Sequence, residues 1–250
     1  MDNDHPNDIN VAHRQTVLQN ILQLRHQGEQ LLLTSGAVPD DVLANELRAP
    51  GSDQRGGVNI VSHPPAIVSH QIMLLQQHLR TYEPYQYYYP VADLHLTVIE
   101  ICSSQPLSDV TSRAARVVDR LPQAMQGASL AALSTPVVGY DARGCALNFI
   151  PTDQALASIR AQLVERLAVH GIAPAPRYPP QSAHVTFMRY VEPLRTPPER
   201  WVSVLRELAC DSSLRWTLSE LWVTWGATWY GNQSRIHEAG PYRIEPLRSE

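Results

Sequence analysis

The spacing of hydrophobic residues changes along this chain, and the changes predict where helices and strands lie. Across residues 9–33, apolar side chains recur every three or four positions, with Val17, Ile21 and Leu24 on one side. This spacing predicts a long amphipathic helix. A second, shorter helix is predicted over residues 40–48, because a proline and two aspartates precede its first apolar positions.

Residues 50–57 have the composition of a linker, since they consist of proline, glycine, serine and other polar residues. We therefore predict two parts, a helical N-terminal extension with its linker over residues 1–56 and a larger domain over residues 57–250. The extension either packs on that domain or mediates self-association. Its residue pattern does not indicate any chemistry.

Beyond the linker, short apolar runs typical of strands alternate with longer segments whose apolar residues have helical spacing. The order of elements repeats, which gives two comparable halves at residues 58–125 and 127–245. The predicted strands cover residues 58–62, 94–99, 129–138, 145–150, 183–188, 216–225 and 242–244, and the predicted helices cover residues 67–79, 106–121, 152–170 and 197–209. The third of these helices is predicted to begin at an N-cap, Thr152, and to end at Gly171. This order predicts an α+β fold, with two small antiparallel sheets, outer helices and a cleft between the sheets.

A histidine–x–threonine tripeptide occurs in two of the predicted strands, as His95-Leu96-Thr97 and His184-Val185-Thr186. Successive side chains of a strand point to opposite faces, so each histidine shares a face with its threonine. Two such strands facing one another would combine two acid/base groups with two hydroxyl donors. That combination suits phosphate chemistry without a metal, and histidine with threonine is a poor ligand set for zinc. A single histidine of this kind is more often an ordinary strand residue; the matching pair favours a functional site.

Composition narrows the class of protein. A chain of 250 residues with 44% hydrophobic and 18% charged residues can form one large globular domain, or one domain and an extension. No apolar run is long enough to span a membrane, and the acidic N-terminus lacks a signal-peptide pattern. The three cysteines, Cys102, Cys145 and Cys210, are too far apart for a zinc pattern and match no disulfide framework. A reducing cytoplasm is the simplest expected location.

All 20 basic residues are arginines, because the chain contains no lysine. The absence excludes a P-loop lysine, a Schiff base and the lysyl–nucleotide intermediate of ATP-dependent ligases. The simplest cause of the absence is genomic base composition. A net charge of −4 argues against nonspecific binding of long nucleic acid, whereas a small anionic substrate or one end of an oligonucleotide remains compatible.

Residues 57–246 resemble the two-histidine (2H) phosphoesterase superfamily, which includes the bacterial 2′-5′ RNA ligase-like proteins and cyclic nucleotide phosphodiesterases. The resemblance rests on the two His-x-Thr strands, each after a helix and about 90 residues apart, and on Asp93-Leu94 before the first histidine. One departure is Ser182-Ala183 before the second histidine, where many members carry a proline.

The resemblance implies a bilobal fold in which the two motifs face each other across a central groove. It also implies metal-independent attack on a 2′,3′-cyclic phosphate or a 2′-5′ phosphodiester in a small nucleotide or an RNA end, with no cofactor. His95, Thr97, His184 and Thr186 carry over as the catalytic set. We expect one histidine to accept a proton from water and the other to protonate the departing ribose oxygen, in an order that the sequence leaves open. The threonines would donate to the nonbridging oxygens.

Other residues are weaker candidates for substrate binding. Tyr89 ends a tyrosine-rich stretch, Arg177 and Tyr178 lie in a proline-rich loop before the second motif, and Arg235 lies in a loop near the C-terminus. Core packing or a solvated loop explains each of them equally simply. His63 belongs to no motif and is expected to be structural or exposed.

The sequence leaves two rival functions open. One is a nucleotide- or RNA-binding module that keeps the groove but catalyses little. The two acid/base groups argue against it, because a protein that only binds does not need them. The other is an interaction protein whose helical N-terminus is the functional part.

Overall fold

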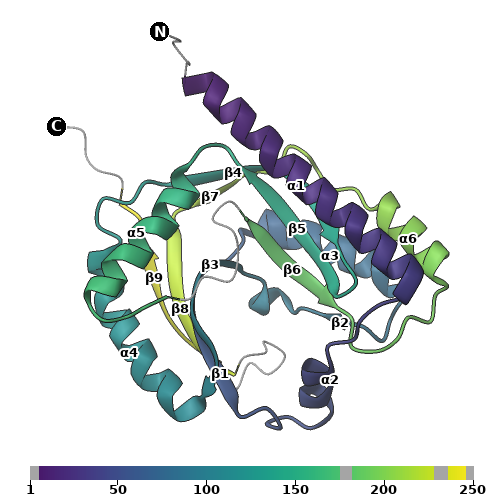
Figure 1. Ribbon diagram of the computed structural model, residues 1–250, viewed down its shortest axis with the longest axis horizontal. Helices are drawn as coiled ribbons and strands as arrows, with labels where there is room; N and C mark the ends of the chain where they lie inside the picture. The colour runs from purple at the N-terminus through teal and green to yellow at the C-terminus, as the bar shows by residue number, and fades with distance from the viewer. Residues whose placement is uncertain (1–5, 175–181, 228–235, 246–250) are drawn as a thin grey trace.

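Antiparallel strands form one strongly curled sheet with helices around it (Figure 1) in the computed structural model, which describes residues 6–174, 182–227 and 236–245. The described strands are β1 (Arg55–Ser62), β2 (Tyr87–Tyr88), β3 (Leu96–Pro106), β4 (Ala131–Tyr140), β5 (Gly144–Pro151), β6 (His184–Arg189), β7 (Trp216–Leu218), β8 (Glu220–Ala227) and β9 (Ile236–Arg243). The described helices are α1 (Pro6–Ser35), α2 (Asp41–Arg48), α3 (Ala66–Arg80), α4 (Leu107–Ala124), α5 (Ala155–Val169) and α6 (Pro198–Glu207), with a 3-10 turn at Val91–Asp93. The predicted α+β class is confirmed.

The sheet consists of two antiparallel halves that meet at its centre. The strand order is β7-β4-β5-β6-β3-β1-β8-β9, with β2 added beside β6. Between β6 and β3 a single residue pair, Leu96 with Val185, is in register. The two sheets that the sequence predicts are therefore the two halves of one continuous sheet, joined at this pair.

The predicted strand over residues 216–225 is in fact two strands, because the chain passes from one half of the sheet to the other. β7 pairs with β4 in the first half, and β8 pairs with β1 in the second. The break falls at Ser219, whose carbonyl accepts the backbone N–H of Ile244 at 2.8 Å. The last strand, expected near residues 242–244, begins at Ile236.

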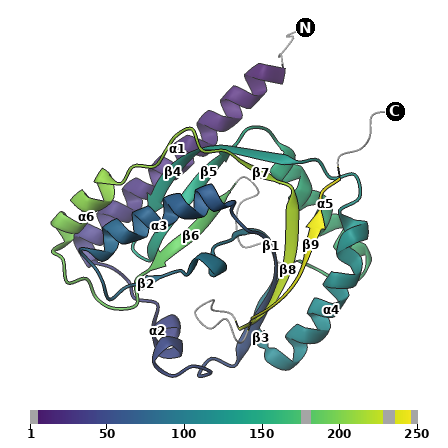
Figure 2. The ribbon, with the colours of Figure 1, turned by 180° about the vertical axis from the view of Figure 1, so that it is seen from behind.

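Helices cover both faces of the first half of the sheet. α3 lies behind β5 and β6 in Figure 1, and α1 crosses in front of β4 and β5. In the view from behind, Figure 2, α3 is in front of these strands and α1 lies behind them. On the other half, α4 packs against β1 and β8, and α5 packs against α4 and β3. None of the helices in the described ranges is long and apolar enough to cross a membrane.

The predicted N-cap of α5 is wrong. The helix begins at Ala155, and the Asp153 carboxylate accepts the Ala155 backbone N–H at 2.8 Å. Thr152 instead donates its backbone N–H to Ala132 of β4 at 2.9 Å, so its backbone still pairs with the neighbouring strand. The predicted end is confirmed, since Gly171 follows the helix with φ +69°, a left-handed conformation that glycine adopts at little cost.

α1 is packed onto the body of the protein. A Cβ atom at Gly28 would lie 2.6 Å from the Cα of Asp141, so the missing side chain lets the helix approach the β4–β5 turn. Beside it, Glu29 is 7% exposed and accepts hydrogen bonds from the Tyr140 hydroxyl at 2.5 Å and from Arg206 Nη2 at 2.7 Å. Leu32 is fully buried. Packing on the larger domain was one of the two roles that the sequence left open for this segment.

Candidate functional site

The two His-x-Thr tripeptides lie side by side at the centre of the sheet. Antiparallel pairing of Leu96 with Val185 places His95 across from Thr186 and Thr97 across from His184. Leu96 and Val185 are fully buried, so the flanking side chains point to the opposite face, and all four of them are partly exposed. The structure thus brings the four sequence-predicted residues together, from β6 and from the start of β3.

Arg160 of α5 ties the two motif strands to each other. Arg160 is only 8% exposed. Its guanidinium donates hydrogen bonds to the carbonyls of Thr97 at 2.9 Å, Val98 at 2.7 Å and Ser182 at 2.6 Å. Burial lowers the pKa of Arg160 to about 10, so the group stays charged at neutral pH. Because one residue pair joins β3 to β6, these three hydrogen bonds supply much of the connection between the motifs.

His95 is held as a neutral ring with a defined tautomer. Its Nδ1 lies 2.7 Å from the Asp93 backbone carbonyl, which can only accept, so Nδ1 carries the proton and Nε2 keeps its lone pair. Burial lowers the pKa of His95 to about 4, against the opposing effect of this hydrogen bond, and a positive charge on His63 lowers it further.

His184 is neutral for similar reasons. Burial lowers its pKa to about 4, and the positive charges of Arg160 and Arg189 add to the effect. Its Nδ1 lies 2.7 Å from the Ser182 hydroxyl, which can donate to the neutral ring or accept from the protonated one. The serine that departs from the family pattern therefore contacts the second histidine directly.

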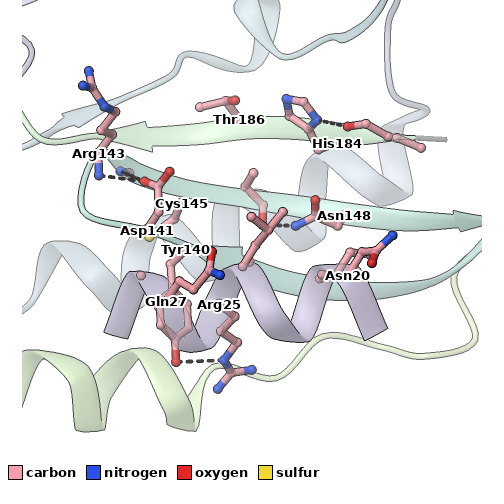
Figure 3. Close-up of a pocket in the computed structure, with 18 of the residues that line it drawn as sticks. Asn20, Arg25, Gln27, Tyr140, Asp141, Arg143, Cys145, Asn148, His184 and Thr186 are labelled. Carbon is pink, nitrogen blue, oxygen red and sulfur yellow. Dashed lines mark hydrogen bonds between the residues drawn. The ribbon is translucent and has the colours of Figure 1, made fainter. Parts of the chain in front are cut away.

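Two pockets flank the motif residues. The larger has a volume of about 700 Å³ and is lined by His184 and Thr186, by the β4–β5 turn and by one side of α1. Figure 3 shows this pocket, with Asn20 and Gln27 on α1 and Asn148 on β5. The smaller has a volume of about 160 Å³ and is lined by His95, His63, Glu238 and neighbouring residues of β1, β8 and β9. α1 thus contributes to the site, although its sequence showed no chemical pattern.

A third imidazole stands beside His95 and was not expected there. His63 Nε2 lies 2.6 Å from Glu238 Oε1, and Nδ1 lies 3.1 Å from the Leu94 carbonyl. Both partners accept, so the ring carries both protons and a positive charge. Burial is the largest single effect and lowers the pKa of His63, but the hydrogen bonds to Glu238 and to the Leu94 carbonyl, together with the negative charges of Glu238 and Asp93, outweigh it and raise the pKa. The ring also packs edge-on against Trp222, with centroids 4.9 Å apart.

Of the weaker binding candidates, Tyr89 lies in the described part of the chain and does not line either pocket. Tyr89 is 6% exposed, and its ring packs edge-on against Tyr87 in the core. Arg177, Tyr178 and Arg235 fall outside the described residues, so their roles stay predictions. Across the described ranges, no group of three or more histidine, cysteine, aspartate or glutamate side chains is arranged to hold a metal ion.

Known proteins resemble this chain in structure but not detectably in sequence. No protein-family model and no curated protein matches it. The structure of Escherichia coli LigT complexed with 3′-AMP superposes with a TM-score of 0.52 at 15% identity, over 78% of this chain and 99% of LigT. The structure of TT0787 from Thermus thermophilus superposes with a TM-score of 0.50 at 13% identity, over 77% of this chain and 100% of that protein. At such identities the likeness shows a shared fold.

Proposed function

Because the chain has the fold of the two-histidine phosphoesterases, as its sequence predicts, we propose that it is a phosphodiesterase of the two-histidine type. It hydrolyses 2′,3′-cyclic phosphates or 2′-5′ phosphodiesters in nucleotides or RNA ends without a metal ion. One observation carries the proposal: the Leu96–Val185 pair sets two imidazoles and two hydroxyls around one point on the open face of the sheet. A protein that only bound nucleotides would have no need of two acid/base groups there.

The histidines perform the proton transfers of an in-line displacement. One neutral ring accepts a proton from water as the water oxygen bonds to phosphorus. The other ring, protonated, gives its proton to the ribose oxygen as the P–O bond breaks. Nε2 of His95 is the ring nitrogen without a proton, which suits it to the first role.

The second role requires a proton on a ring that is neutral in the free protein. An anionic phosphate next to the ring favours its charged form and so raises its pKa. For His184, the Ser182 hydroxyl can accept from Nδ1–H once the ring is protonated. Substrate binding therefore supplies the negative charge that favours the protonated ring.

The threonines stabilise the charge that builds on phosphorus-bound oxygens. Thr97 and Thr186 lie diagonally across the site, each opposite a histidine. Their hydroxyls donate to the two nonbridging oxygens, and such donors contribute about 2.7–4 kcal/mol each in comparable oxyanion sites. The 3′-AMP in the LigT structure supports a small nucleotide or RNA terminus as the substrate here.

A direct test is incubation of the protein in EDTA with a 2′,3′-cyclic mononucleotide and, separately, with a 2′-5′-linked dinucleotide. We expect the cyclic nucleotide to be opened to a monoester, the dinucleotide to be cleaved into two products, or both. The rate in EDTA should equal the rate in a metal-containing buffer. Failure to cleave either substrate while the folded protein still binds 3′-AMP would favour the rival function, a binding module.

A further inference from the structure

The two pockets beside the motif residues differ in volume more than fourfold, at about 700 and 160 Å³. An in-line displacement places the attacking and the departing oxygen on opposite sides of phosphorus. The smaller pocket, at His95, has room for water but little for a nucleoside. The larger pocket, at His184 and Thr186, has a volume within the range of small-molecule sites.

α1 forms one wall of the larger pocket. Leu24 and Leu31 line it while remaining 64% and 50% exposed, so their apolar surfaces are open to whatever occupies the pocket. Asn20 and Gln27 line it from the same helix, and within the described part of the chain neither side chain makes a hydrogen bond. Figure 3 shows these two amides on the side of α1 towards β5, whereas Arg25 extends the other way to the Tyr140 hydroxyl.

The position of this wall is fixed by contacts that do not involve the pocket-facing amides or leucines. The Gly28 backbone lies against the β4–β5 turn, and the buried Glu29 bonds to Tyr140 and Arg206. The helix is thus held at a set distance from β5, where Asn148 provides a third amide opposite Asn20 and Gln27.

We propose that this pocket binds the nucleoside that carries the departing oxygen, and that α1 determines which base is preferred. The inference rests on the proposed function and adds the place and recognition of the substrate. The leucines offer an apolar surface to a planar base, and carboxamides carry both donors and acceptors, which match the polar edge of a base. It follows that His184 protonates the departing oxygen and His95 activates the water.

The test compares two pocket-facing variants of α1 with two matched variants of the same helix. Leu24→Ala and Gln27→Ala alter the pocket wall. Leu22→Ala and Gln23→Ala change the same residue types at exposed positions that do not line the pocket. Each variant is assayed with a 2′,3′-cyclic mononucleotide and with glycerol 1,2-cyclic phosphate, which has the reactive ring but no base. Binding of 3′-AMP is measured separately by calorimetry.

We expect Leu24→Ala and Gln27→Ala each to raise KM for the nucleotide and Kd for 3′-AMP about fivefold, the size expected for one lost contact. The preference for nucleotide over glycerol cyclic phosphate, as a ratio of kcat/KM, should fall by a similar factor. Both control variants should match the wild type. Equal effects in pocket and control variants, in a wild type that hydrolyses the nucleotide, would overturn this inference and leave the proposed function standing.

If the wild type hydrolyses neither compound, it is assayed with a 2′-5′-linked dinucleotide. If that is not cleaved either, the proposed function fails and the binding measurement alone decides about the pocket. Weaker 3′-AMP binding in the pocket variants than in the controls would then support a nucleoside site walled by α1. Absent binding, or binding that all four variants share equally, would overturn it.

Discussion

Leu96 and Val185 form the residue pair that joins the two halves of the sheet, and both side chains are fully buried. The pair has two consequences for function. It fixes the register in which each histidine lies opposite the threonine of the other motif, and it turns those four side chains to the open face. A shift of one residue in either strand would turn that strand's histidine and threonine into the core.

Arg160 should be essential to this junction. Arg160→Met removes a donor from three carbonyls, one buried and two partly buried, and should lower the free energy of unfolding by about 3 kcal/mol, the effect of unsatisfied buried groups. It should also raise the pKa of His184, because the positive charge of Arg160 contributes to lowering it. Denaturant unfolding and NMR titration measure the two effects. Arg120→Met, at an exposed position on α4, is the control, and equal destabilisation by both variants would contradict this role.

The threonine hydroxyls should matter for rate and little for folding. Thr97→Val and Thr186→Val keep the shape of the side chain and remove the donor, so each should lower kcat about a hundredfold or more. The melting temperature should change little. Thr217→Val, an exposed threonine on β7, is the matched control and should keep full activity. Unaltered turnover in both motif variants would remove the threonines from the mechanism.

The histidines should titrate in a characteristic order. Burial lowers the pKa of both His95 and His184 to about 4, whereas at His63 the effect of burial is exceeded by the hydrogen bonds to Glu238 and Leu94 and by nearby negative charge, which together raise its pKa. NMR titration of the free protein should therefore show two rings neutral down to about pH 5 and one that stays protonated above its ordinary range. Adding inorganic phosphate should move the first two midpoints upwards, because an anion stabilises the charged ring. Ordinary midpoints for His95 and His184 without phosphate would contradict this electrostatic account.

The carboxylate of Glu29 should make the attachment of α1 depend on pH. Its hydrogen bond with Arg206, above all, lowers the pKa of Glu29 in the folded protein. A lowered pKa gives stability that is present above the pKa of the unfolded chain and lost as pH falls through the folded value. Glu29→Gln should therefore cost about 1–3 kcal/mol at pH 7, with a smaller difference at pH 3. Glu165→Gln, at an exposed position on α5, is the control; a difference independent of pH would contradict the linkage.

The arrangement of the His-x-Thr motif was predictable from sequence because its signal is local. Alternation along a strand is enough to put His95 and Thr97 on one face, whatever the strand pairs with. The partners of Arg160 and His63 were not predictable in this way. Arg160 binds backbone carbonyls, which leave no mark in residue type, and Glu238 lies far along the chain from His63.

The role of α1 was missed for a different reason. Helical spacing places both Leu32, which is fully buried, and Leu24, which faces the pocket, among the apolar positions. Nothing in the spacing separates a leucine that packs in a core from one that lines an open site. The division of the predicted strand over residues 216–225 was missed similarly, because apolar residues continue on both sides of Ser219-Glu220.

The central claim is that His95 and His184 together perform the chemistry without a metal. The most direct measurement is the rate of hydrolysis of a 2′,3′-cyclic nucleotide in EDTA by the wild type, His95→Ala, His184→Ala and the control His70→Ala, which changes an exposed histidine of α3. We expect activity in the wild type and the control, and a loss of at least about a hundredfold in each motif variant. Activity that survives both motif substitutions would contradict it.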